Sequence, residues 1–239
     1  MTYCAGIKLK TGIVGIADTC ITSGTTKSEA KKIYTYSNTS STFFILSSGL
    51  RSVRDKAITY FEEEVSKDTF HLHKLYQVAN EFGKIVKRVS AEDKSSLEEN
   101  NYKFDSHALL GGQMKDDLNQ ELYMIFPEGN WIRVGESNTC YAVIGNGSFG
   151  KSILSSSLDP DGTIEYTKKV ALLSFHQTVK NTNNVDYPLD LVVYEKNSYK
   201  LQLVRMDRNS MMQMAGTFES ELKKIIGGLA IPSDPVYQQ

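Results

Sequence analysis

The chain has 239 residues, of which 40% are hydrophobic and 23% charged, a composition typical of a folded globular protein. Its formal net charge of −1 favours neither nucleic acid nor an anionic membrane as a partner. The longest apolar runs are too short to span a bilayer, and residues 1–20 lack a signal-peptide pattern. The three cysteines, Cys4, Cys20 and Cys140, are scattered and fit no metal or disulfide spacing. We therefore expect a cytoplasmic protein with no metal site and no cofactor.

The first half of the chain is predicted to begin with strands and to continue with two helices. Strands are expected at 3–9 and 13–17, joined by a turn at Lys10–Gly12, and then at 31–36 and 42–47. Ser52 is a plausible cap for the first helix, and apolar residues from Leu72 to Val89 at helical spacing predict the second. The charged, glycine-free segment Ala91–Asn101 is expected to be a solvated loop.

The second half is predicted to contain four strands, two helices, two strands and a last helix, at 106–112, 121–126, 131–134, 141–144, 148–158, 163–182, 189–194, 200–205 and 211–226. Strands grouped in blocks and helices grouped in blocks indicate two sheets packed together and covered by helix layers, not a parallel sheet of βαβ units. We therefore predict an α+β fold, a four-layer αββα sandwich, which forms a single domain over residues 1–239.

The opening Met1-Thr2-Tyr3-Cys4 is the first segment that could carry catalytic chemistry. If Met1 is removed, Thr2 becomes the first residue and offers a hydroxyl nucleophile together with an α-amine as its base. An α-amine titrates near ~8, close to working pH, which suits a general base. Many unrelated proteins also begin Met-Thr, so this feature alone does not identify a hydrolase.

Three further residues lie where predicted strands end. The hairpin turn returns residues 18–21 beside residue 2, and Asp18 there ends an apolar strand and needs a partner. Lys32 opens the third strand, and a lysine held charged near an α-amine lowers the pKa of that amine. The alternative is an ion pair with a purely structural role. Gly49 permits the close backbone approach that an oxyanion hole requires, or equally an ordinary strand-to-helix turn.

These features resemble the proteasome β-subunit family of N-terminal-nucleophile hydrolases. The Met-Thr-Tyr-Cys opening is similar to that of the bacterial Anbu branch, a relative of the HslV peptidase. Ile144–Lys151, Ala171–Phe175 and Pro188–Glu195 also resemble segments of that branch, so the likeness covers nearly the whole chain. The resemblance implies a threonine-type peptidase that assembles with copies of itself and cleaves peptides or unfolded proteins. It leaves open whether an unfolding ATPase is a partner.

The resemblance also assigns roles to individual positions. It implies four catalytic residues, namely the nucleophile Thr2, its charge support Asp18 and Lys32, and the oxyanion donor Gly49. Thr22 matches the position whose backbone pairs with an extended substrate. Ser47 falls where the family shapes the pocket for the residue before the cut, and its small side chain would leave that pocket roomy.

Several positions depart from the family pattern. Cys20 stands where an arginine is usual, and Asn146 stands where a serine is expected. Asn181 and Asn184 align roughly with the aspartate and serine that hold the N-terminal amine in proteasomes. Asparagine can form hydrogen bonds but supplies no negative charge. A catalytically weak or silent self-assembling scaffold subunit of the same fold is therefore the alternative function.

A rival motif occurs at Gly145–Ser152, which fits the phosphate-loop pattern letter for letter. A true phosphate loop belongs to a parallel sheet of βαβ units, which the predicted block order does not supply. Nucleotide binding is the third and least favoured interpretation.

Overall fold

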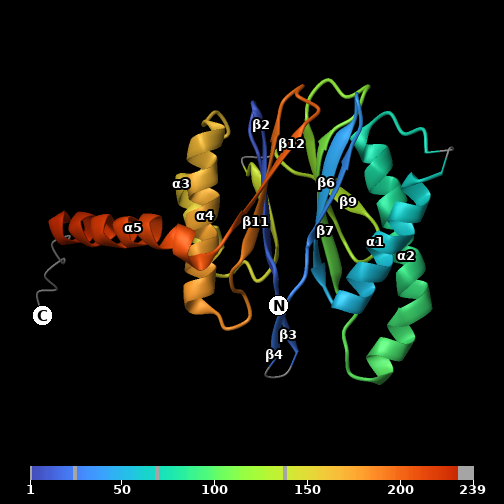
Figure 1. Ribbon diagram of the computed structural model, residues 1–239, viewed down its shortest axis with the longest axis horizontal. Helices are drawn as coiled ribbons and strands as arrows, with labels where there is room; N and C mark the ends of the chain where they lie inside the picture. The colour runs from blue at the N-terminus through green and yellow to red at the C-terminus, as the bar shows by residue number, and fades with distance from the viewer. Residues whose placement is uncertain (1, 24–25, 68–69, 137–138, 231–239) are drawn as a thin grey trace, which may run out of the picture.

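A computed structural model describes residues 2–23, 26–67, 70–136 and 139–230 of the chain. The elements in chain order are β1 (Tyr3–Lys8), β2 (Gly12–Asp18), β3 (Cys20–Ser23), β4 (Thr26–Glu29), β5 (Ile33–Ser37), β6 (Thr42–Gly49), α1 (Arg51–Val65), α2 (Leu75–Glu99), β7 (Ser106–Gln113), β8 (Glu121–Ile125), β9 (Trp131–Arg133), β10 (Tyr141–Gly145), α3 (Gly150–Ser157), α4 (Ile164–Asn181), β11 (Leu189–Glu195), β12 (Leu201–Met206) and α5 (Arg208–Gly228). Figure 1 shows two sheets face to face, with α1 and α2 outside one and α3 and α4 outside the other. The predicted α+β, four-layer αββα sandwich is confirmed.

Both large sheets are antiparallel throughout. One has the strand order β10-β1-β2-β11-β12, and the other has the order β5-β6-β7-β8-β9. The opening hairpin pairs Cys4 with Ala17, so the next residue along β2, Asp18, lies beside the start of β1. This register confirms the expected return of the chain to the neighbourhood of residue 2.

Hydrophobic side chains fill the space between each pair of layers. One cluster lies between the β1 sheet and helices α3 and α4, and another lies between the β6 sheet and helices α1 and α2. The third lies between the sheets, where Phe44 packs above two glycines. A Cβ atom on Gly15 or Gly111 would come within 3.0 and 2.6 Å of the Phe44 ring. The absence of side chains at these two positions therefore makes room for the ring at the centre of the molecule.

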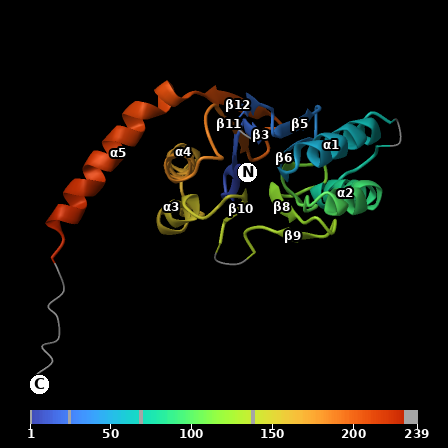
Figure 2. The ribbon, with the colours of Figure 1, turned by 90° about the horizontal axis from the view of Figure 1, so that it is seen from below.

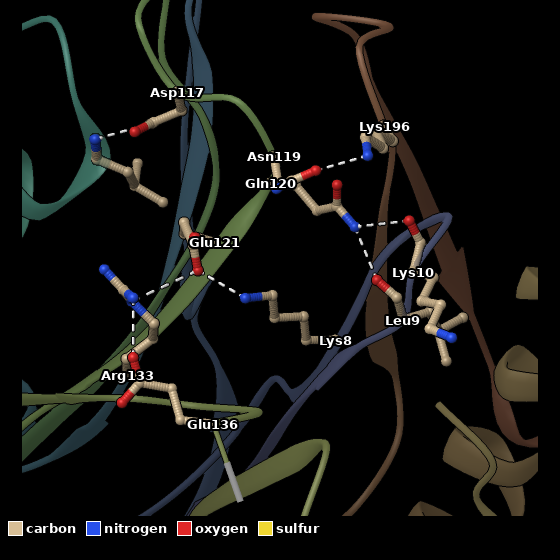
Figure 3. Close-up of polar contacts among 11 residues, drawn as sticks. Lys8, Leu9, Lys10, Asp117, Asn119, Gln120, Glu121, Arg133, Glu136 and Lys196 are labelled. Atoms are coloured by element: carbon tan, nitrogen blue, oxygen red, sulfur yellow. Dashed lines mark hydrogen bonds and ion pairs between the residues drawn. The ribbon is translucent and has the colours of Figure 1, made fainter. Parts of the chain in front are cut away.

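A polar clamp joins the two sheets at the far end of the opening hairpin (Figure 3). Lys8 on β1 donates to a carboxylate oxygen of Glu121 on β8 at 2.6 Å, and both side chains are largely buried. The side-chain amide of Gln120 donates to the backbone carbonyls of Leu9 and Lys10 at 2.7 and 3.3 Å. These bonds hold the hairpin of one sheet against β8 of the other, and so set how the two sheets meet.

Helices α1 and α2 differ from the prediction at one end each, and α5 begins three residues earlier than predicted, at Arg208. Helix α1 begins at Arg51 after Leu50, which is extended and provides no side-chain cap, so the expected Ser52 cap is wrong. Helix α2 continues to Glu99 through the segment expected to be a loop. Its charged residues pair across to α1, with Lys56 at 2.7 Å from Asp93, and Leu97 packs against the core. The segment is helical because of these tertiary contacts, which periodicity alone does not reveal.

A small hairpin was not anticipated. Strands β3 and β4 pair with each other through four residue pairs, from Cys20 with Glu29 to Ser23 with Thr26. The segment is polar and lacks the apolar alternation from which strands are usually recognised. Figure 1 shows this hairpin extending from the lower end of the sandwich.

In the part of the chain described above, none of the helices has both the length and the apolar character needed to cross a membrane.

Candidate active site

Thr2 lies immediately before β1, at one end of the space between the sheets, with 5% of its surface exposed. Its carbonyl oxygen accepts a hydrogen bond from the backbone N–H of Asn146 at 2.7 Å. The next backbone N–H, that of Tyr3, donates to Oδ1 of Asp18 at 2.9 Å. The threonine is therefore held from β10 on one side and from β2 on the other.

Gly145 completes this support and was not singled out in the sequence as a site residue. It pairs with Tyr3 across β1 and β10 and has a φ of +80°, a backbone conformation that favours glycine. A Cβ atom here would lie 2.0 Å from the Thr2 carbonyl oxygen. The position therefore needs glycine both for its dihedral angle and for the close approach of the Thr2 backbone.

Lys32 is the centre of the site. Its buried ammonium lies 3.0 Å from Oγ1 of Thr2, 2.8 Å from Oδ2 of Asp18 and 2.8 Å from the carbonyl oxygen of Cys20. An ammonium has three N–H donors and no acceptor, and these three oxygens use all of them. In this arrangement Lys32 supplies positive charge to the Thr2 hydroxyl and has no lone pair with which to take a proton.

Asp18 provides the negative charge that this buried ammonium needs. Burial raises the pKa of the Asp18 carboxyl above its ordinary value, while the Lys32 ammonium and the Tyr3 N–H oppose that rise. A buried ammonium left without its carboxylate would carry a large desolvation cost. Asp18 therefore both neutralises Lys32 and fixes its direction toward Thr2, which joins three of the expected residues in one cluster.

Two other expected residues lie at the end of β6. The backbone N–H of the buried Ser47 donates to the Lys32 carbonyl oxygen at 3.1 Å. Gly49 has a φ of +118°, and a Cβ atom there would lie 1.8 Å from the carbonyl oxygen of Asp105. The fold thus requires glycine at position 49, independently of any role of its N–H toward a substrate.

Asn146 contacts Thr2 through its backbone, whereas Thr22 belongs to the β3–β4 hairpin. Thr22 lies in β3 and pairs with Lys27 in β4. Among the described strands β3 pairs with β4 alone, so its other edge has no strand beside it. Asn146 binds Thr2 through its main-chain N–H, while its side-chain oxygen accepts weakly from the N–H of Ser148 at 3.4 Å.

Asn181 and Asn184 are not joined to Thr2. Asn181 is the last residue of α4, and its side-chain amide donates to the carbonyl oxygen of Gln177 at 2.8 Å within the same helix. Across the ranges that the structure describes, neither asparagine makes a hydrogen bond to the threonine.

The loop between α4 and β11 contains one acidic residue, Asp186. Its carboxylate accepts a hydrogen bond from Arg208, and it lines a cavity of about 300 Å³ together with Cys20.

The phosphate-loop interpretation does not fit the observed fold. The strand before the motif, β10, is an edge strand that pairs antiparallel with β1. The N–H of Asn146 is already bonded to Thr2, and the N–H of Lys151 donates to the Gly147 carbonyl oxygen at 3.2 Å. The loop therefore supports the threonine and does not form a cradle in a parallel sheet.

Two antiparallel sheets between helix layers, with a threonine at the start of the first strand, define an N-terminal-nucleophile hydrolase fold. The family model described as Proteasome subunit matches residues 2–193, and the chain belongs to that family. A search of curated protein sequences found no match.

Among solved structures, the chain is similar to members of the Anbu (ancestral β-subunit) branch. An Anbu mutant from Hyphomicrobium sp. strain MC1 superimposes with a TM-score of 0.89 at 25% identity, over 98% of this chain and 100% of that one. Anbu from Yersinia bercovieri gives a TM-score of 0.88 at 23% identity, over 98% and 99%. The helical assembly of the Anbu complex from Pseudomonas aeruginosa gives 0.89 at 23% identity, over 99% and 100%. At 23% identity, the likenesses to the Yersinia and Pseudomonas proteins concern the fold alone.

Proposed function

We propose that the chain is a threonine-type endopeptidase that becomes active when Met1 is removed and Thr2 carries a free α-amine. The observation that supports this most directly is the Lys32 ammonium, which contacts the Thr2 hydroxyl at 3.0 Å and is neutralised by Asp18 at 2.8 Å. A lysine–aspartate pair with a purely structural role would not need to face the hydroxyl of the one threonine that can become N-terminal.

The proposed reaction follows from the donors and acceptors at the site. Because a Lys32 ammonium paired with Asp18 has no lone pair, the base is the α-amine of Thr2, which takes the hydroxyl proton as Oγ1 attacks the scissile carbonyl carbon. The amine then returns the proton to the departing peptide nitrogen as the C–N bond breaks and an ester to Thr2 remains. Water, deprotonated by the same amine, hydrolyses this ester and restores the hydroxyl. Lys32 favours the neutral, basic form of the amine through its positive charge.

Substrate contacts are proposed from the surrounding backbone. An extended peptide would add to the unpaired edge of β3 at Thr22, and main-chain hydrogen bonds would align it beside Thr2. The N–H of Gly49 would then bind the oxyanion that forms on the attacked carbonyl group.

The test is covalent labelling with a threonine-directed peptide inhibitor, read by intact mass. The Thr2→Ala variant is the matched control, since alanine also permits Met1 removal but lacks the hydroxyl. We expect one inhibitor adduct on the natural sequence after loss of Met1, and none on the variant. Equal labelling of both chains, or retention of Met1 in protein from its native host, would remove the proposed mechanism.

We also propose that the chain assembles with copies of itself. Helix α5 points away from the sandwich in Figures 1 and 2, and only Met211 and Ala215 on it are buried. It exposes Met212 near its start, and its outer half exposes the apolar side chains of Leu222, Ile225 and Ile226. The apolar stripe of α2 is buried in the chain's own core.

An apolar helix face of this kind needs a covering surface, and a neighbouring copy would provide one. Light scattering at micromolar concentration should show a large oligomer that Ile225→Asp reduces in size, while Lys223→Asp on the same helix leaves it intact. A natural chain that remains monomeric would contradict the proposal. Assembly without hydrolysis would favour the alternative function, a silent scaffold subunit. In support of this alternative, Asn181 and Asn184 make no hydrogen bond to Thr2 among the described residues.

A further inference from the structure

A cavity of about 260 Å³ lies beside the candidate site, between the start of β5, the end of β6 and helix α1. Lys32 and Ser47 both contribute to its wall, which places the cavity next to the Thr2 hydroxyl. Ile33, Tyr34 and Ile58 add apolar surface. Pockets for drug-sized ligands measure ~300–1,000 Å³, so this cavity suits a single amino-acid side chain.

Arg54 on α1 also lines the cavity and has 3% of its surface exposed. Two of its nitrogens, Nε and Nη2, donate to the same oxygen of Asp55 at 3.2 and 3.1 Å. The third, Nη1, is enclosed and has no hydrogen-bond partner among the described residues. An unpaired buried N–H group on a charged side chain lowers the stability of the fold, because the group has lost its hydrogen bonds to water and forms none within the protein.

The other charged groups of the cavity do not explain this guanidinium. Lys32 is neutralised by Asp18, and Lys31 is exposed. Asp55 is 51% exposed and shares its other carboxylate oxygen with Arg51 at 3.1 Å. Glu62, the second carboxylate in the wall, is exposed and forms no ion pair with Arg54 among the described residues. The buried part of the cavity is therefore cationic at Arg54, and Asp55, with which Arg54 is paired, faces water.

We propose that this cavity selects an acidic substrate side chain, glutamate in particular, with Arg54 as the residue that determines this specificity. The substrate carboxylate would pair with the guanidinium from the cavity side, while the aliphatic stem would pack against Ile33, Tyr34 and Ile58. Ser47 leaves space for the stem and contributes no charge. The inference rests on the proposed peptidase function, since the cavity is assigned to the residue before the cut through its position beside Thr2.

The first experiment compares two peptide substrates that differ only in glutamate or glutamine before the cleaved bond. We expect kcat/KM to be about tenfold or more higher for glutamate, as for a desolvated charge-assisted pair. Arg54→Gln should bring the ratio of the two close to one, and Arg54→Lys should retain part of it. Arg51→Gln is the matched control, because Arg51 also binds Asp55 but does not line the cavity, and it should keep the full ratio. Equal rates for the two peptides, or a ratio unchanged in Arg54→Gln, would overturn the inference.

The second experiment separates this inference from the proposed reaction. Thr2→Ala protein cannot turn over a peptide, so binding of fluorescent peptides that end in glutamate or glutamine can be followed by anisotropy. Tighter binding of the glutamate peptide, lost on adding Arg54→Gln, supports the cavity even if no peptide is ever hydrolysed. Hydrolysis without any such preference means that the inference fails while the peptidase proposal stands. Absence of binding by both peptides at millimolar concentration overturns the cavity as a side-chain site.

Discussion

Replacing Lys32 by methionine tests whether the positive charge of Lys32 lowers the pKa of the Thr2 α-amine in the proposed site. Methionine keeps an unbranched side chain of similar volume in the buried position but removes the ammonium that contacts Thr2, Asp18 and the Cys20 carbonyl. If the α-amine of Thr2 is the base, the loss of this charge should raise the pKa of the amine. The rising limb of the pH–rate profile should then move to higher pH.

The size of the shift can be worked from the geometry. The Lys32 ammonium lies 3.0 Å from Oγ1 of Thr2. The α-nitrogen of Thr2 is separated from Oγ1 by Cβ and Cα, so a distance on the order of 5 Å between this nitrogen and the ammonium is compatible with standard bond lengths. Two unit charges at that distance interact by about 3 kcal/mol at an effective dielectric constant of ~20, or roughly two pKa units. Without the ammonium the buried Asp18 carboxyl would take up a proton, and the loss of its negative charge would offset part of this effect, which leaves about one unit.

The assay is hydrolysis of a fluorogenic peptide between pH 6 and pH 10 by chains with Met1 removed. We expect the rate at neutral pH to fall about 10²-fold and the midpoint of the rising limb to move up by about one unit. Lys10→Met is the control, because Lys10 is an exposed lysine at the opposite end of the β1–β2 hairpin, and it should change neither quantity. An unchanged midpoint and rate in Lys32→Met would refute the assignment of the α-amine as the base.

Three further outcomes are expected. Asp18→Asn should lower peptide hydrolysis about as much as Lys32→Met, because the ammonium loses its counterion, and steady-state rates with matched folding controls check this. Gly145→Ala should abolish hydrolysis and lower the unfolding free energy by about 1–3 kcal/mol, since its φ of +80° and the Thr2 carbonyl oxygen both exclude a Cβ atom. Urea denaturation of this variant with an unchanged midpoint would contradict that account. Phe44→Ala should cost about 3–5 kcal/mol in the same measurement, because the ring fills the space between the sheets and two neighbouring glycines cannot refill it.

The order of the elements and the core of the site could be predicted from the sequence. Blocks of strands and helices excluded a parallel sheet, and the hairpin turn at Lys10–Gly12 predicted that the chain returns to Thr2. Because side chains at strand ends follow from the pairing of neighbouring strands, Asp18 and Lys32 could be placed near the threonine without coordinates. The family resemblance then gave these positions their proposed roles.

Other features depended on contacts between distant segments. The extension of α2 to Glu99 is stabilised by ion pairs with α1, and the β3–β4 hairpin has no apolar alternation to mark it. The side-chain amide of Asn181 donates to a carbonyl oxygen of its own helix, although the family resemblance placed this residue beside the α-amine of Thr2. Local pattern does not contain this information, because the partner groups lie far away in the sequence.

What the sequence by itself determined is the identity of the charged and nucleophilic side chains at the strand ends and the layered fold that gathers them. Only the tertiary structure decided how they are held. The carbonyl of Cys20, the N–H of Asn146 and the dihedral angle of Gly145 support the threonine and its lysine through the backbone. Every residue carries the same backbone groups, so their use is not visible in the amino-acid types. The burial of Arg54 beside the site likewise depends on how α1 packs against the sheet, which no local pattern specifies.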